Sequence, residues 1–478
     1  MTRTRSFSLI LGCLLTLSGC FAKIHQLPAH TDQHQPVFAP LPDRDTLVGL
    51  AVSGGGSRAA TFAAGTLEAL ANVRFMEGGQ ECSVLQAVTH MSSVSGGSLA
   101  TAYYAAKKPA RTEPVFAGQQ LSPTYQQFFA RFKGDMQKNF QIRALGRQVL
   151  NFRVANPTKF AYSFADVWDA HFFHDVNFSD LYVRAQHGDA PQVLLNGTIY
   201  NSGRRLVLTT LAPADFAYDF TAELRGKLIA KGLQFTPEGK ASFDRSVDRA
   251  KNQFLPLTME GLGADHRTLP LSLAVATSAS FPPVVGPVTY RTAGSTSYTH
   301  VGDGGLFDNL GTESLTTLFL NKLNPAHPTA TRGLVIVIDA SYPFDEGAAD
   351  LGDSDKGFAV FTEDPARIVG IMEERANAYQ AMLWHSLRTE GVLLPDYDHL
   401  KLILLRHTDA EWTKDDPIPA GCPSGLTPAD VTRMLRQIPT LFKIDEECHA
   451  PLLFAAAKKV VDKQQDRIVK FLESAPTH

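Results

Sequence analysis

Apolar runs and helical segments alternate along the first part of the chain. Residues 47–52 and 84–94 are rich in apolar side chains, as expected of buried strands, whereas residues 59–71 and 98–106 favour helices. This β-α-β-α order is typical of a parallel sheet with helices on both faces. Further strands are predicted downstream, at residues 193–200, 205–210, 334–339 and 402–405. The pattern therefore predicts an α/β protein whose ligands bind at the carboxyl edge of the sheet.

Two long insertions interrupt this alternation. Residues 107–192 are rich in aromatic side chains, which predicts either a lid over a ligand site or, as we favour, a helical subdomain whose aromatic side chains pack inward into a core of its own. Residues 223–263 form a second insertion of helical character. Toward the carboxyl end, helices are predicted at 365–388, from 427 onward and at 455–472, the last packed against the domain.

A serine among small residues stands between the second predicted strand and the second predicted helix. Ser95 lies in the sequence Ser93-Val94-Ser95-Gly96-Gly97. A nucleophile at a strained strand-to-helix turn needs small neighbours, which Ser93, Gly96 and Gly97 provide. The start of a helix also favours an anion. Ser95 is the candidate nucleophile, although Ser93 replaces the first glycine of G-x-S-x-G and a tight turn without chemistry is the alternative.

A glycine-rich loop follows the first strand. Gly54, Gly55 and Gly56 have no side chains, so their N–H groups can point at a developing oxyanion. Arg58 ends the loop and either holds it or favours an anionic substrate. The loop lacks the Lys-Ser or Lys-Thr of a P-loop, and no acidic residue ends a second predicted strand about twenty residues on, as a dinucleotide site would require. We therefore predict an oxyanion-binding loop.

The third candidate is a carboxylate between glycines. Asp303 follows Gly302 and precedes Gly304 and Gly305, which let it approach another backbone closely. A serine hydroxyl needs an adjacent base to take its proton. Asp303 is the candidate base, and an Asp-Gly turn between strands is the alternative.

Taken in order, the motifs GGGSR at 54–58, SVSGG at 93–97 and DGG at 303–305 resemble those of the patatin-like phospholipase family. The block AVATSASFPP at 274–283 is similar to the Ala/Ser/Pro block that precedes the aspartate in that family. The resemblance covers roughly residues 46–341.

The resemblance implies a three-layer α/β/α fold with a mainly parallel sheet. It also implies a Ser-Asp dyad, with Ser95 as nucleophile, Asp303 as its partner, and Gly54, Gly55, Gly56 and Arg58 as the oxyanion-binding loop. The implied activity is that of a serine esterase or phospholipase, which hydrolyses a phospholipid, lysophospholipid or other carboxylic ester without a cofactor.

The amino terminus has the layout of a secretory signal. Two arginines precede an apolar run at 7–17, and small residues precede Cys20. This layout resembles the lipobox of bacterial lipoproteins. The resemblance implies cleavage before Cys20, lipidation of that cysteine and attachment to the cell envelope, with Phe21 favouring the outer membrane. An ordinary secretory signal or a short anchor is the alternative, although the apolar run is short for a membrane span.

These observations predict four regions. Residues 1–19 are a signal peptide, 20–45 a lipidated tether without apolar periodicity, 46–410 the catalytic domain with its two insertions, and 411–478 a helical extension packed on that domain. Cys20 remains in the mature chain together with Cys82, Cys422 and Cys448, and in an oxidising compartment Cys422 and Cys448 are the candidate disulfide.

Charge and ligand patterns exclude other classes. The net charge of −3 gives no basic excess for nucleic acid. The cluster His171, His174 and Asp175 has a spacing suited to metal but no further ligands, and no calcium-binding loop occurs. We expect a membrane and a lipid or ester as partners, and no metal ion or cofactor.

Two other functions fit parts of the sequence. Asp339 and His407 follow Ser95 in the chain order of an α/β-hydrolase triad, and both end strand-like runs. A lipoprotein that binds lipid without catalysis is the other possibility, against which stands the presence of all three motifs.

Overall fold

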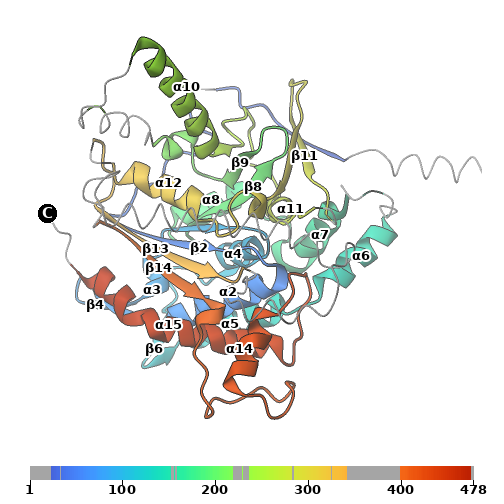
Figure 1. The fold of residues 1–478 in the computed structure, drawn as a ribbon, viewed down its shortest axis with the longest axis vertical. Coiled ribbons are helices and arrows are strands. Elements are labelled where there is room, and N and C mark those ends of the chain that lie inside the picture. Colours follow the sequence, from blue (N-terminus) through green and yellow to red (C-terminus); the bar gives the residue numbers. More distant parts are fainter. Residues whose placement is uncertain are drawn as a thin grey trace, which may run out of the picture.

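A mixed β-sheet forms the centre of the molecule (Figure 1). The computed structural model describes residues 23–32, 34–151, 156, 159–218, 229, 236–282, 285–324, 326–341 and 399–474. The strands follow one another across the sheet as β1 (Ile24–Leu27), β11 (Val288–Thr292), β12 (Thr299–Asp303), β8 (Gln192–Ile199), β5 (His90–Ser93), β2 (Thr46–Val52), β13 (Arg332–Asp339) and β14 (Leu400–Arg406). β9 (Arg204–Thr209) pairs with β8, and β10 (Leu257–Thr258) pairs with β9.

The half of the sheet that carries the predicted nucleophile is parallel. β8, β5, β2, β13 and β14 all run in one direction. β12 and β9 run antiparallel to β8, and β11 runs antiparallel to β12. The carboxyl end of β12 pairs with the last third of β8, where Asp303 lies opposite Gly197.

Side chains of the central strands alternate between two cores. On β13, Leu334, Ile336 and Ile338 belong to one apolar cluster and Val335 and Val337 to the other. Three helices cover the first face, α2 (Gly56–Asn72), α4 (Gly96–Lys107) and α15 (His449–Glu473), and α12 (Thr312–Lys322) covers the second (Figure 1). The predicted α/β fold, with three layers and a mainly parallel sheet, is confirmed.

Most predicted elements are present. The strands expected at 47–52, 193–200, 205–210, 334–339 and 402–405 correspond to β2, β8, β9, β13 and β14, and the helices at 59–71 and 98–106 to α2 and α4. The strand predicted at 84–94 is wrong in its first half, which forms the short helix α3 (Val84–Ala87). Ser83 and Gln86 make a capping box there, and a short apolar run does not separate strand from helix by itself.

The aromatic insertion is helical and buried. It contains α5 (Pro123–Met136), α6 (Phe140–Leu150), α7 (Phe160–Trp168) and α8 (Phe178–Gln186). Its aromatic side chains pack inward as predicted, but they join the main core rather than a separate one, since Phe129, Phe132, Trp168 and Phe172 belong to the same cluster as α2 and α4.

The remaining predicted helices lie toward the carboxyl end. The second insertion contains α10 (Pro237–Phe254), and Thr427 caps α14 (Pro428–Arg436) through a capping box with Asp430. α15 packs on α2 so closely that a Cβ on Gly65 would lie 2.9 Å from Phe454. The helix predicted at 365–388 lies outside the described residues.

The segment expected to be a tether is instead part of the domain. β1 extends the edge of the sheet by pairing with β11, and Leu27, Val37 and Phe38 are buried in the core. Phe38 packs on Tyr182, with ring centroids 5.1 Å apart. The expectation of a solvated linker over the whole of 20–45 is therefore wrong. Three apolar anchors and one edge strand fix this segment although its sequence shows no periodicity.

Residues 1–22, including the predicted signal peptide and Cys20, lie outside the described residues. None of the helices in the described part of the chain has the length and apolar character needed to cross a bilayer.

Candidate active site

Ser95 occupies a strained turn between β5 and α4. Its φ of 53° and ψ of −121° lie outside the regions that serine normally adopts, and only His174 and Asp175 share a positive φ among the described non-glycine residues. A Cβ on Gly97 would lie 2.4 Å from the carbonyl oxygen of Ser53, so only glycine fits there. The sharp turn at Ser95 between β5 and α4 thus has the strained backbone that is typical of a nucleophile elbow.

Asp303 reaches Ser95 from the far side of β8. It ends β12, it is buried, and its Oδ1 accepts the N–H of Gly305 at 2.8 Å. Burial raises the pKa of Asp303 to about 7, and the Gly305 N–H and the Ser95 side chain oppose that rise. Oδ2 of Asp303 has no hydrogen-bond partner within normal distance. The Ser95 side chain, whose interaction lowers the pKa of Asp303, therefore lies next to the carboxylate.

Some N–H groups of the glycine loop form hydrogen bonds within the fold, and others have no partner in the described structure. Gly54 donates to the carbonyl oxygen of Asn309 at 2.8 Å, and Ser57 donates to that of Leu441 at 2.7 Å. The N–H groups of Gly55 and Gly56 donate to no other group in the described structure, nor does that of Gly96, directly after the nucleophile. Gly55, Gly56 and Gly96 thus remain candidate oxyanion donors, whereas the N–H of Gly54 is already paired within the fold.

Arg58 holds the loop rather than facing the site. Its side chain is fully buried. The guanidinium donates to the carbonyl oxygen of Ala340 at 2.8 Å, to that of Ile438, and to the hydroxyl of Thr440 at 3.0 Å. The prediction that Arg58 belongs to the oxyanion site is not supported, because its charge is committed to joining the loop to the carboxyl-terminal segment.

Ser278, on α11 (Leu271–Ser278), fixes the backbone of the nucleophile. Its Oγ accepts the N–H of Ser95 at 3.1 Å and donates to the carbonyl oxygen of Asn196 at 2.6 Å. Ser278 lies in the Ala/Ser/Pro block that the sequence singled out without a role. The hydrogen bonds give that block a function in the site, which is to orient the elbow.

Asn196 lies beneath the elbow and was not predicted. It is buried on β8, and its Nδ2 donates to the carbonyl oxygen of Ser93 and to the hydroxyl of Ser92, both at 2.9 Å. Its Oδ1 accepts the hydroxyl of Ser314 at 2.5 Å. A polar residue within an apolar strand was the sequence signal that would have located it. All of its hydrogen-bonding groups have partners, as a buried amide requires.

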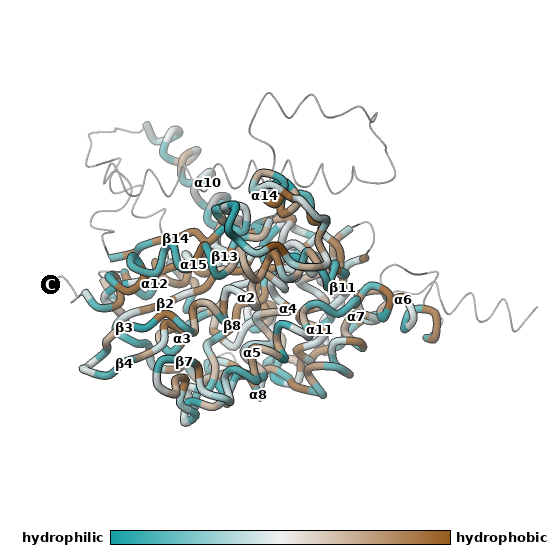
Figure 2. The backbone as a smooth tube through the Cα atoms, turned by 90° about the horizontal axis from the view of Figure 1, so that it is seen from below, coloured by the Kyte–Doolittle hydropathy of each residue, from teal (hydrophilic) through white to brown (hydrophobic). Residues whose placement is uncertain are grey.

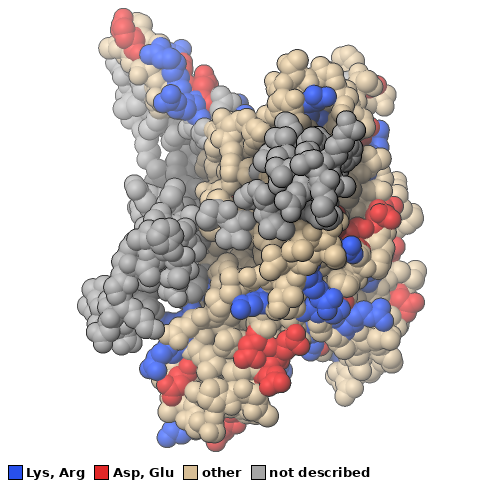
Figure 3. Space-filling model, turned by 90° about the vertical axis from the view of Figure 1, so that its right-hand side faces the viewer, with Lys and Arg blue, Asp and Glu red and all other residues tan. Residues whose placement is uncertain are grey.

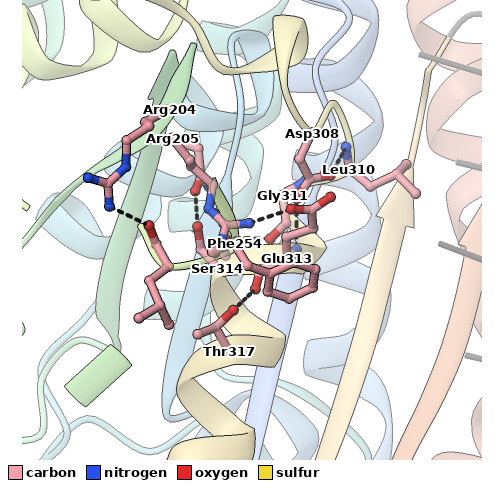
Figure 4. A network of polar contacts seen from close by, with 12 residues as sticks. Arg204, Arg205, Phe254, Asp308, Leu310, Gly311, Glu313, Ser314 and Thr317 are labelled. Atoms are coloured by element: carbon pink, nitrogen blue, oxygen red, sulfur yellow. Dashed lines mark hydrogen bonds and ion pairs between the residues drawn. The ribbon is translucent and has the colours of Figure 1, made fainter. Parts of the chain in front are cut away.

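A second polar network supports the segment around Asn309, whose carbonyl oxygen accepts the N–H of Gly54 (Figure 4). Asp308 accepts the N–H of Gly311 at 3.1 Å and that of Glu313 at 2.7 Å. Arg205, which is fully buried, pairs with Glu313 at 2.8 Å. This network holds the start of α12 and with it the Asn309 carbonyl that fixes the glycine loop.

Asp339 and His407 do not form a triad with Ser95. His407 is buried, and its Nδ1 lies 3.3 Å from the main-chain carbonyl of Asp339 while its Nε2 has no partner in the described structure. Burial and the nearby Arg58 lower the pKa of His407 to about 4. The Asp339 carboxylate instead bonds Arg406 at 2.9 Å and Ser341. The carboxylate that a triad would need for His407 is thus engaged elsewhere.

Other predicted groups have separate places in the fold. Cys422 and Cys448 are joined in a disulfide, and Cys82 is a free thiol. His171 bonds Arg143 at 3.0 Å. No group of three metal-binding side chains gathers among the residues described. Surface clefts of about 720 and 330 Å³ lie between α2 and α15 and beside β14, and none of the site residues lines them.

The model of the patatin-like phospholipase family matches residues 50–316, more than half of the chain. The chain belongs to the patatin-like phospholipase family. Membership supports a lipid-hydrolysing enzyme of the esterase or phospholipase type, and the nucleophile, the aspartate and the glycine motif all lie within the matched residues. No curated protein matches the sequence.

Similar solved structures include human GIVD cytosolic phospholipase A2. The protein alone has a TM-score of 0.42 and 13% identity over 89% of this chain and 60% of that one. Its complex with methyl gamma-linolenyl fluorophosphonate has a TM-score of 0.41 and 15% identity over 90% of this chain and 60% of that one. This patatin-like chain therefore spans 60% of the length of the human chain.

Proposed function

We propose that the protein is a serine lipid acyl hydrolase that uses a Ser95–Asp303 dyad at a bacterial envelope membrane. The observation that supports it best is the placement of a strained serine beside a buried carboxylate, whose pKa burial raises to about 7, next to N–H groups with no other partner among the described residues. A base with a pKa near neutrality is suited to accept a proton and return it.

Acylation begins when the Ser95 Oγ attacks the ester carbonyl carbon. The Asp303 carboxylate takes the hydroxyl proton as the new C–O bond forms, and the carbonyl oxygen becomes an oxyanion. The N–H groups of Gly55, Gly56 and Gly96 donate to that oxyanion. The intermediate then collapses, the ester C–O bond breaks, and the leaving alcohol takes the proton from Asp303.

Deacylation repeats these steps with water. Asp303 takes a proton as water attacks the acyl-enzyme, and the same N–H groups stabilise the second oxyanion. Collapse breaks the bond to the Ser95 Oγ, which takes the proton back as the fatty acid leaves. The dyad thereby returns to its starting state without a histidine.

The substrate and location follow from the family and from the amino terminus. A phospholipid, lysophospholipid or neutral ester supplies the acyl group. Lipidation of Cys20 would attach the enzyme to the envelope, most simply to the periplasmic side of the outer membrane. Labelling cells with an alkyne fatty acid tests this proposal, because wild type should carry the label and Cys20→Ala should not.

Two variants test the dyad. Ser95→Ala and Asp303→Asn should each abolish hydrolysis of a short-chain aryl ester, whereas Ser246→Ala, on the exposed α10, should keep it. A fluorophosphonate probe should label wild type at Ser95. Full activity in either dyad variant would overturn the mechanism, and a folded wild type that neither hydrolyses esters nor reacts with the probe would favour a lipid-binding protein without catalysis.

A further inference from the structure

Helix α6 carries an unusual exposed apolar face. Ile142, Leu145, Val149 and Leu150 are 67%, 53%, 54% and 73% exposed, and they account for four of the ten strongly exposed large apolar side chains in the described structure. The opposite face is buried through Phe140, Ala144 and Gln148. Within the described part of the chain, the helix is therefore packed on one side and exposes a second apolar side, and Figure 2 shows α6 with its apolar stretches at the edge of the molecule.

The charges beside this face suit a lipid surface. Arg143 and Arg147 lie on α6 between the buried and the exposed apolar positions, and the helix contains no Asp or Glu. An apolar helix face bordered by arginines is typical of helices that lie in the plane of a membrane interface. Figure 3 views this side of the molecule and shows Lys and Arg side chains across its middle.

The start of the described chain lies on α7, the helix that packs against α6. Lys23 lies over the ring of Tyr162 on α7, with its Nζ 4.1 Å from the ring centroid, and its carbonyl oxygen accepts the Tyr162 hydroxyl at 3.4 Å. α6 packs against α7 (Figure 1). Cys20 is three residues before Lys23, and three residues extend at most about 11 Å. A lipid on Cys20 would enter a bilayer beside the helix pair that carries the apolar face.

The face is also connected to the nucleophile. α7 packs against α11, and Ser278 on α11 accepts the N–H of Ser95. We propose that the exposed face of α6 docks on the surface of a phospholipid bilayer and holds the active site at the lipid interface. The proposal rests on the proposed function, in which the substrate is a membrane lipid. The proposed lipid on Cys20 and the docking face of α6 would then together orient the enzyme on the membrane.

A binding experiment tests contact with lipid without hydrolysis. The full chain with Ser95→Ala and Leu145→Trp is reconstituted in phosphatidylcholine–phosphatidylglycerol vesicles that contain brominated acyl chains. Met76→Trp is the matched control, since Met76 is 51% exposed on β3 (Arg74–Glu77), away from α6. We expect the tryptophan on α6 to be quenched at least about twofold more than the control, because an interfacial helix buries its apolar face among acyl chains.

A hydrolysis experiment separates docking from chemistry. The double variant Ile142→Glu/Leu145→Glu should lower hydrolysis of vesicle phospholipid roughly tenfold and leave hydrolysis of a dissolved short-chain ester within about twofold, because only the vesicle reaction needs the apolar face. Met76→Glu should change neither rate. If the double variant misfolds, both rates fall and the quenching experiment alone decides.

Three results would overturn the proposal. The first is quenching on α6 no greater than at position 76, and the second is unchanged vesicle hydrolysis in a folded double variant. The third is a dimer in solution that the double variant dissociates, which would assign the face to a second copy of this chain. Failure of the proposed function gives a different result from failure of docking. In that case the Ser95→Ala variant would still hydrolyse the dissolved ester.

Discussion

Gly56 and Gly96 meet backbone to backbone, so closely that a Cβ on Gly96 would lie 1.9 Å from the carbonyl oxygen of Gly56. The two glycines begin α2 and α4, the helices that follow the glycine loop and the nucleophile. Because their contact allows no side chain, the proposed oxyanion donors and Ser95 are held as one backbone unit. The geometry of the site depends on this contact as much as on the reacting side chains.

Gly96→Ala should therefore lower kcat for a short-chain ester by roughly 100-fold or more, since removing a single oxyanion donor costs that much in a serine protease of similar chemistry. The matched control is Gly134→Ala on α5, where a Cβ would meet nothing within 4 Å. The control should keep its activity and unfold at the same or a higher temperature. An active Gly96→Ala enzyme would show that the contact is not required.

The raised pKa of Asp303 predicts the pH dependence of the reaction. In the proposed mechanism only the ionised carboxylate of Asp303 can accept the proton of Ser95, and burial raises the pKa of Asp303 to about 7. The kcat/KM for a neutral ester should rise tenfold per pH unit on the acid side and level off above about pH 7. A profile already flat at pH 5, measured with an ester that does not itself titrate, would argue against Asp303 as the base.

The same pKa predicts an effect on stability with a defined sign. The folded state holds the Asp303 proton more tightly than the unfolded state, whose pKa is near 3.8. The contribution of Asp303 to the free energy of unfolding is therefore fully present below about pH 4. It is lost as the pH rises through 7, which lowers the free energy of unfolding by on the order of 2 to 4 kcal/mol. Asp303→Asn keeps an acceptor for the Gly305 N–H and carries no charge. It should be more stable than wild type at pH 8 but not at pH 4, as measured by urea unfolding.

Asn196 is a positioning residue whose effect should appear in kcat. Asn196→Asp loses the amide donors to Ser92 and Ser93, so the elbow should loosen and kcat should fall while KM changes little. The rate of labelling by a fluorophosphonate should fall in parallel. Asn196→Leu should also destabilise the fold by about 2 to 4 kcal/mol, because several buried groups lose partners. Asn201→Asp, just beyond β8, is the control and should match wild type. An unchanged kcat in a folded Asn196→Asp variant would assign the residue to stability alone.

The sequence predicts a candidate site residue where the pattern that identifies it lies in its own sequence neighbours. Ser95, Asp303 and the glycines could be found because a strained turn and a close backbone approach require small residues next to the functional one. The pairing of the Gly54 N–H and the choice between the two roles considered for Arg58 could not be predicted, because they depend on Asn309, Ala340 and Ile438, which come from distant parts of the chain. The strand at the amino terminus was missed for the same reason, since β1 is stabilised by β11 and not by its own pattern.

The carboxyl-terminal segment supports the glycine loop, and the disulfide closes that segment. Leu441 accepts the Ser57 N–H and Ile438 accepts Arg58, and both lie between Cys422 and Cys448, which are 26 residues apart. A loop of this length stabilises the folded state by roughly 3 kcal/mol through chain entropy. Cys422→Ser/Cys448→Ser, or reduction of wild type, should therefore lower the melting temperature and lower activity at temperatures where most of the fold remains intact.

The control for this last prediction is Cys82→Ser, which keeps the bond and should melt like wild type without reductant and lose stability with it. Alkylation and mass measurement before and after reduction report the bond directly. If activity and unfolding fell together at every temperature, the segment would support the whole domain and not the glycine loop in particular. If reduction changed neither the mass after alkylation nor the melting temperature, the bond would be absent in solution and the Arg58 contacts alone would hold the loop.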